Sequence, residues 1–137
     1  MKRESKVISL ELAKQIHAEH KRLGIEVESE WWWVLTRQDE EADLCDMRRI
    51  RLYKGDFYDV IPAYDTSELG EMLPNYIEIN GVMSFPGYGY YINGDKIARY
   101  LADGKTKILF SGDTEAEARG KLYLWLLEEG YIKEVER

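Results

Sequence analysis

The feature that most constrains this chain is a helix signal near its C-terminus. Thr114 stands three residues before Glu117, the spacing of a capping box, in which each side chain satisfies one free backbone amide. Gly130 can end the same helix, because glycine readily adopts the left-handed conformation that closes a last turn. One apolar face at helical spacing consists of Ala118, Leu122, Trp125 and Leu126. We therefore expect a helix of about fifteen residues that packs on a sheet.

Similar signals predict two further helices. The first spans Ser9 to Leu23, its first residue can cap it, and Gly24 follows as a stop. The second is short: Asp65 caps it, Glu68 stands three residues later, and Pro74 ends it, because proline disfavours helical geometry in the residue before it. The buried side of this short helix is expected to contain Leu69, Met72 and Leu73.

The segments between the first two helices predict strands. Trp31 to Thr36, Arg49 to Tyr53 and Phe57 to Ile61 have the aromatic, β-branched or alternating character of strands. Lys54 to Asp56 is a short turn, and the acidic stretch from Arg37 to Asp46 most simply forms a solvated loop. A helix followed by an antiparallel meander is expected here.

The second half predicts another antiparallel sheet. Asn80-Gly81 separates two strand-like segments and is the strongest short signal for a type I′ hairpin, since both turn residues need positive φ. Further strands are expected at Tyr88 to Ile92, Ile97 to Leu101 and Lys107 to Phe110. The predicted fold class is thus α+β: antiparallel sheets with an N-terminal helix, a short central helix and a C-terminal helix, in a single domain over residues 1–137.

Composition narrows the class of protein further. The chain is 45% hydrophobic and 12% aromatic, which is too apolar for an intrinsically disordered chain. Its net charge of -7 leaves no positive excess to neutralise phosphates, so direct nucleic-acid binding is not expected. A lone cysteine, no apolar run long enough to span a membrane and no signal-peptide pattern together favour a reducing cytoplasm.

Residues that could carry chemistry are few. His17 and His20 lie three residues apart on the first helix, and Cys45 is a distant third candidate ligand. A structural zinc site usually needs four ligands, so two ordinary helix histidines are the favoured interpretation, and we expect no metal and no cofactor. The acidic stretch lacks the glycine and closing glutamate of an EF-hand, and neither a nucleophile motif nor a phosphate-binding loop occurs. The sequence therefore identifies no catalytic residue.

The aromatic runs are the most unusual feature. Trp31-Trp32-Trp33 cannot bury all three side chains on one face of a strand, so Trp32 points away from its neighbours. Two interpretations stay open. If the opposite face is covered, these residues are core; if it is exposed, they form an interaction patch with the nearby tyrosines. The candidate patch consists of Trp32, Tyr88, Tyr90 and Tyr91.

Three segments carry a resemblance to a known group of proteins. They are Ser29 to Trp33, Ile61 to Pro74 and Asp113 to Leu122. In these motifs and in the order of its elements, the chain resembles small proteins encoded by bacterial phages and prophages, a group without an established activity. The resemblance covers nearly the whole chain. It implies an accessory protein in an infected or lysogenic bacterium, and it transfers no catalytic residue.

These observations favour a non-enzymatic phage or prophage accessory protein that binds a bacterial or phage protein in the host cytoplasm. One alternative is an inhibitor of a host defence nuclease, similar to an anti-CRISPR protein that mimics nucleic acid with its carboxylates. Another is a metal-dependent enzyme that uses His17 and His20. A third is a structural protein that assembles through an exposed sheet edge, which leaves a homo-oligomer open.

Overall fold

The computed structural model describes residues 6–36, 43–46, 57–90 and 93–132. In these residues it contains three helices and two antiparallel sheets, which confirms the α+β fold class. The helices are α1 (Leu10–Leu23), α3 (Thr66–Met72) and α4 (Glu115–Glu128). The strands are β1 (Trp31–Thr36), β2 (Asp43–Asp46), β3 (Phe57–Pro62), β4 (Ile77–Ile79), β5 (Val82–Tyr90), β6 (Lys96–Ala102) and β7 (Lys105–Gly112). None of the described helices is both long and apolar enough to cross a membrane.

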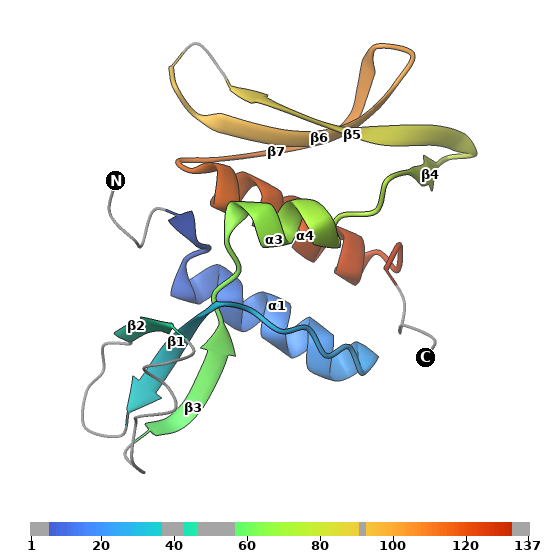
Figure 1. Ribbon diagram of the computed structural model, residues 1–137. Helices are drawn as coiled ribbons and strands as arrows, with labels where there is room; N and C mark the ends of the chain where they lie inside the picture. Colours follow the sequence, from blue (N-terminus) through green and yellow to red (C-terminus); the bar gives the residue numbers. More distant parts are fainter. Residues whose placement is uncertain (1–5, 37–42, 47–56, 91–92, 133–137) are drawn as a thin grey trace.

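The elements are arranged in layers around α4. Figure 1 shows α3 and α4 beneath the four-stranded sheet, α1 on the other side of α4, and the three-stranded sheet beyond α1. The predicted apolar face of α4 is indeed buried at Ala118, Leu122 and Leu126, and it packs on β6 and β7. Because α1 covers α4 as well, burial extends to further residues, namely Ala116, Gly120, Tyr123 and Leu127. One hydrophobic cluster joins residues of all three helices and both sheets.

Gly120 on α4 lies directly against Leu12 of α1 and against Ile8, which precedes that helix. A β-carbon on this residue would lie only 2.7 Å from a methyl carbon of Ile8 and 2.7 Å from a methyl carbon of Leu12. Such distances are shorter than van der Waals contact, so any larger residue would push the two helices apart. The absence of a side chain at Gly120 therefore sets the distance between the two longest helices of the described structure.

The N-terminus of α4 differs in one respect from the prediction. The Thr114 hydroxyl accepts a hydrogen bond from the Glu117 amide at 3.1 Å, as a capping box requires. The Glu117 carboxylate, however, accepts a hydrogen bond from the backbone N–H of Ser9, the residue that caps α1. The glutamate thus joins two helix N-termini instead of completing a box within one. At the other end, Gly130 has φ of 80°, and the Tyr131 amide donates to the Leu126 carbonyl, which closes the helix as predicted.

The short helix α3 has the complete capping box that its sequence predicts. The Asp65 carboxylate accepts from the Glu68 amide at 2.8 Å, and the Glu68 carboxylate accepts from the Asp65 amide at 3.0 Å. The same carboxylate also accepts from the Ser29 hydroxyl and from the Glu30 amide, at 2.9 and 3.0 Å. Glu68 therefore fixes the chain just before β1 as well as the start of α3.

The three-stranded sheet has the order β2-β1-β3 and corrects one prediction. Asp43 to Asp46 was expected in the acidic loop, but these residues form β2 and pair with β1. Between its two charged ends, β2 carries Leu44 and Cys45, and the thiol of Cys45 is fully buried opposite Trp32. The predicted strand from Arg49 to Tyr53 and the predicted turn after it lie outside the described residues.

The four-stranded sheet has the order β4-β5-β6-β7. Asn80 and Gly81 have φ of 52° and 80°, so the predicted two-residue hairpin between β4 and β5 is confirmed. Two expected strands, one on each side of Pro86, form the single strand β5. Proline is tolerated there because β4 pairs only with Val82–Ser84, which leaves Pro86 on an edge of the described sheet.

The close crossing at Gly120 yields a stability prediction. Gly120→Ala should lower the free energy of unfolding by about 1–2 kcal/mol, because the clash with Ile8 and Leu12 outweighs the better helix propensity of alanine. Gly70→Ala on α3 is the comparison, since its added carbon meets only the Arg119 guanidinium, at 2.8 Å, and no apolar side chain of the core. Urea denaturation of both variants measures the difference. Equal stability of the two variants would show that the helix crossing tolerates a methyl group.

Candidate functional site

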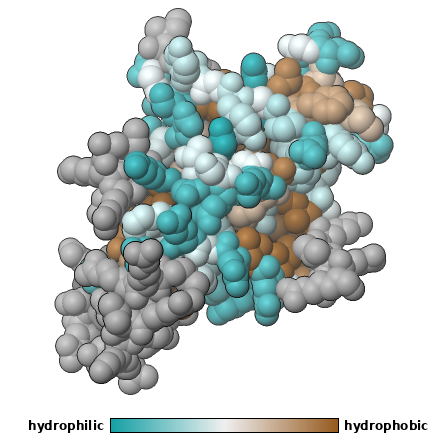
Figure 2. Space-filling view, in the orientation of Figure 1, coloured by the Kyte–Doolittle hydropathy of each residue, from teal (hydrophilic) through white to brown (hydrophobic). Residues whose placement is uncertain are grey.

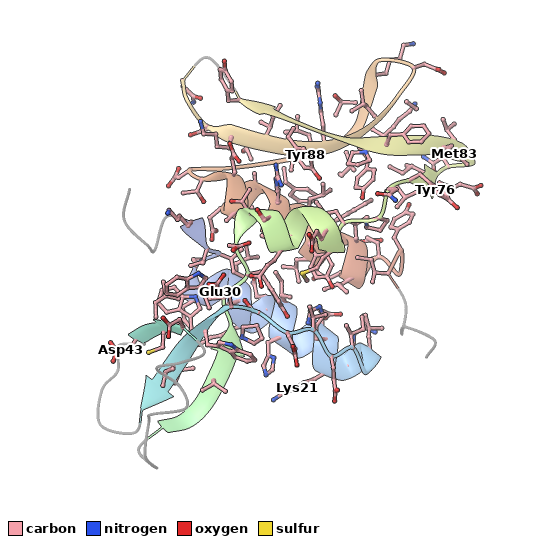
Figure 3. The ribbon with its side chains drawn as sticks, in the orientation of Figure 1. Lys21, Glu30, Asp43, Tyr76, Met83 and Tyr88 are labelled. Carbon is pink, nitrogen blue, oxygen red and sulfur yellow. The ribbon has the colours of Figure 1, made fainter. Side chains whose placement is uncertain are left out.

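The exposed large hydrophobic residues of the described structure follow one strand and its hairpin. All of them lie on β5 or just before and within the β4–β5 hairpin: Tyr76, Val82, Met83, Phe85, Tyr88 and Tyr90, with exposed fractions from 39% to 74%. Because side chains alternate along a strand, Met83 and Phe85 lie on one face of β5, and Val82, Tyr88 and Tyr90 lie on the other. We call these six residues the β4–β5 surface. Figure 2 shows apolar residues gathered at the β4 end of the sheet, and Figure 3 places Tyr76 and Met83 there and Tyr88 further along β5.

The second half of β5 also offers an edge. Residues Phe85 to Tyr90 pair with β6 on one side. On the other side β4 stops opposite Ser84, and no described strand continues beyond it. An edge of this kind presents backbone groups that can pair with another chain. Pro86 interrupts the row of donors, because proline has no backbone N–H.

Two cations lie at the tyrosine end of this surface. The Arg119 guanidinium stacks on the Tyr88 ring at 4.0 Å, and the Lys96 ammonium lies 5.3 Å from the centre of the Tyr90 ring. Arg119 also donates to the Thr66 carbonyl at 3.0 Å, but its Nε is buried without a hydrogen-bond acceptor among the described residues. Burial raises the pKa of Tyr88, and the nearby Arg119 opposes that shift.

The structure separates the residues of the predicted patch. Tyr88 and Tyr90 are exposed on β5, whereas Trp32 lies on β1 in the other sheet and is half-buried. Tyr91 lies outside the described residues. The face of β1 that carries Trp32 is covered, since Val34 and Cys45 on the same face are fully buried. Trp32 therefore has the partly buried position that the core interpretation describes, and it shares no surface with the tyrosines.

Trp32 belongs instead to a cleft of about 460 Å³ beside α1. We call it the α1–β1 cleft. Its lining residues are His17, His20, Lys21, Gly24, Ile25, Glu26, Val27, Trp32, Pro62 and Tyr64. Both histidines of the chain line this cleft together with a tryptophan and a tyrosine. The three-residue spacing of the histidines predicts that they lie close together on α1. No sequence pattern indicates that Trp32 and Tyr64 lie beside them.

A buried histidine lies between two tyrosines at the base of this cleft. His20 Nε2 lies 2.7 Å from the Tyr123 hydroxyl, and His20 Nδ1 lies 3.4 Å from the Tyr64 hydroxyl. Burial, with a smaller contribution from His17, lowers the pKa of His20 to about 4, so the imidazole is neutral at neutral pH. Burial also raises the pKa of both phenols. The three groups form a neutral hydrogen-bonded chain.

This geometry bears on the metal-dependent alternative. Both ring nitrogens of His20 face tyrosine hydroxyls, so neither is directed at a shared ligand with His17. Cys45 is buried in the three-stranded sheet. Across the described parts of the chain, no three side chains of His, Cys, Asp or Glu gather closely enough to hold a metal ion. The described residues therefore contain no ligand set for that mechanism.

The lowered pKa of His20 predicts a loss of stability in acid. In the unfolded chain this histidine takes up a proton near pH 6.5, whereas in the folded chain it does so only near pH 4. Between these values the unfolded state binds the extra proton, so His20 should lower the free energy of unfolding by about 3 kcal/mol as the pH falls. Denaturation of the wild type and of His20→Gln from pH 7 to pH 4 measures this contribution. The variant should be less stable at pH 7 but lose less stability in acid; parallel curves would contradict the assignment.

Comparison with known proteins gives no relative for this chain. No protein-family model, no curated protein and no solved structure matches it. The resemblance to phage and prophage proteins that the sequence motifs indicate therefore remains a prediction.

Proposed function

We propose that this chain is a non-enzymatic accessory protein of a phage or prophage that binds another protein in the host cytoplasm through its β4–β5 surface. The phage setting and the host cytoplasm are inferred from the sequence alone. The observation that carries the binding function is the position of the exposed hydrophobic residues. Single exposed apolar side chains are common on any protein, but here all the large ones that the structure describes share one strand and its hairpin.

The residue types on this surface fit a protein partner. Tyrosine, phenylalanine and methionine are enriched at protein interfaces, because they contribute large contact areas. Three of the six side chains are tyrosines, and each combines an apolar ring with a hydroxyl that can form hydrogen bonds in a partly wet interface. A surface of this composition favours a protein over a membrane or a polynucleotide, for which the chain's net charge of -7 is also unsuitable.

The free edge of β5 supports a mode of binding. An extended segment of the partner can pair with the backbone of Phe85–Tyr90, while its side chains contact the exposed rings on that strand. At the tyrosine end, a carboxylate of the partner would meet Arg119 and Lys96.

Site-specific photocrosslinking tests this proposal. A photoreactive residue in place of Met83 should capture one defined protein from a bacterial lysate that contains the phage or prophage, because Met83 is 47% exposed within the surface. The same residue in place of Lys14, which is exposed on α1, is the control and should not capture that protein. Mass spectrometry of the crosslinked band identifies the partner.

A second variant decides whether the captured protein uses this surface. Phe85→Ser should weaken its binding by at least about fivefold, since truncation of a large side chain at the centre of an interface costs about 1 kcal/mol or more. Calorimetry with the purified partner measures this change. Equal capture at Met83 and Lys14, or unchanged affinity of Phe85→Ser, would overturn the proposal. Light scattering separates the self-assembly alternative, in which the captured protein is a second copy of this chain.

A further inference from the structure

The α1–β1 cleft has the size and walls of a site for a small molecule. Its volume of about 460 Å³ falls within the range of about 300–1,000 Å³ that is typical of ligand pockets. Apolar side chains form much of its lining: Ile25, Val27, Trp32 and Pro62. The Trp32 indole N–H donates to the Ser29 carbonyl at 2.9 Å, which holds the ring in one orientation. A fixed aromatic plane of this kind favours a flat ligand.

The hydrogen-bonded chain of Tyr123, His20 and Tyr64 contains three polar hydrogens but only two hydrogen bonds. Tyr123 and Tyr64 each carry a hydroxyl hydrogen, and the neutral ring of His20 carries one N–H. The two contacts of the chain, at 2.7 and 3.4 Å, use two of these three hydrogens. One hydroxyl hydrogen is therefore left for a further acceptor, and it lies at one end of the chain or the other.

Position relative to the cleft decides which end carries the extra hydrogen, because both tyrosines are buried, Tyr64 with 1% and Tyr123 with 2% of its surface exposed. Tyr64 lines the cleft, whereas Tyr123 does not line it and makes no second hydrogen bond with the described residues. A buried donor without an acceptor is unfavourable, and only Tyr64 can find one in the cleft, so Tyr123 is expected to donate to His20 Nε2. His20 Nδ1–H then donates to the Tyr64 oxygen. This arrangement leaves the Tyr64 hydroxyl hydrogen at the end of the chain that lines the cleft.

The rim of the cleft adds a positive charge. Lys21 is exposed, lines the cleft one helical turn after His17, and lies on the far side of α1 from the four-stranded sheet (Figure 3). Glu26 is also exposed at the cleft and opposes part of this charge. An oxygen acceptor on the ligand can thus be neutral, recognised by Tyr64 alone, or anionic and additionally attracted by Lys21.

From these features we infer that the α1–β1 cleft binds a small planar aromatic molecule that carries a carbonyl or carboxylate oxygen. The ring packs on Trp32 and the apolar wall, and the oxygen accepts the hydroxyl hydrogen of Tyr64. This site is independent of the proposed protein-binding function, because none of its residues belongs to the β4–β5 surface.

Two probes of equal shape test the inference on the full chain. Titration with 2-naphthoate and with 2-naphthamide, followed by calorimetry and by the indole N–H signal of Trp32 in NMR spectra, should show saturable one-to-one binding of at least one probe. Tighter binding of the acid identifies an anionic ligand, and equal or tighter binding of the amide identifies a neutral one. If neither probe saturates below about 5 mM, where binding would be weaker than about 3 kcal/mol, the inference is wrong.

Matched variants locate the acceptor contact. Tyr64→Phe should weaken binding about three- to tenfold through loss of one hydrogen bond, whereas Tyr123→Phe removes the other end of the same chain and should change affinity less than about twofold. Equal losses in the two variants would overturn the assigned role of Tyr64. If Tyr64→Phe does not fold, Val27→Trp replaces it: the larger side chain on the wall of the cleft should weaken the binding of both probes at least about tenfold, and unchanged affinity would place the ligand elsewhere.

Discussion

The structure depends on the close approach of α1 and α4 at Gly120. Ile8 and Leu12 occupy the space that a side chain at position 120 would need. The Glu117 carboxylate accepts a hydrogen bond from the backbone N–H of Ser9 and so holds the N-cap of α1 beside the start of α4. This contact also positions the smaller sheet, because Ile8 donates its amide to the Tyr64 carbonyl and its carbonyl accepts the indole N–H of Trp33. The crossing therefore connects the large sheet, which packs on α4, with the small sheet, which is tied to the N-terminus of α1.

Local signals predicted the helices and the β4–β5 hairpin because the interactions that decide them span only a few residues. The caps at Ser9 and Asp65 and the positive φ of Asn80 are set by their immediate neighbours. β2 was missed because its charged ends resemble a loop, whereas its pairing with β1 is a contact between distant segments. The hydrogen bond of the Glu117 carboxylate was not predicted for the same reason, because its partner Ser9 is 108 residues away in the sequence.

The two candidate sites differ in how much of them the sequence predicts. Tyr88 and Tyr90 stand out as an aromatic run. Their connection with Met83 requires one uninterrupted strand β5, and Pro86 in the middle of that strand argues against it at the level of the sequence. For the cleft, helical spacing brings His17 and His20 to one region of α1. The contribution of Trp32, Tyr64 and Tyr123 depends on how three elements pack around that helix, and no local pattern encodes such packing.

One helix carries a residue that contacts each site. Arg119 stacks on Tyr88 in the β4–β5 surface, and one turn later Tyr123 bonds to His20 at the base of the cleft. Coupling between two sites requires an element with two discrete arrangements that both sites bias. The helix α4 is packed against β6 and β7 on one side and α1 on another, and Gly120, between these two residues, lies directly against Leu12 of α1. A helix confined in this way is a rigid support, so a partner on the sheet and a ligand in the cleft should bind independently.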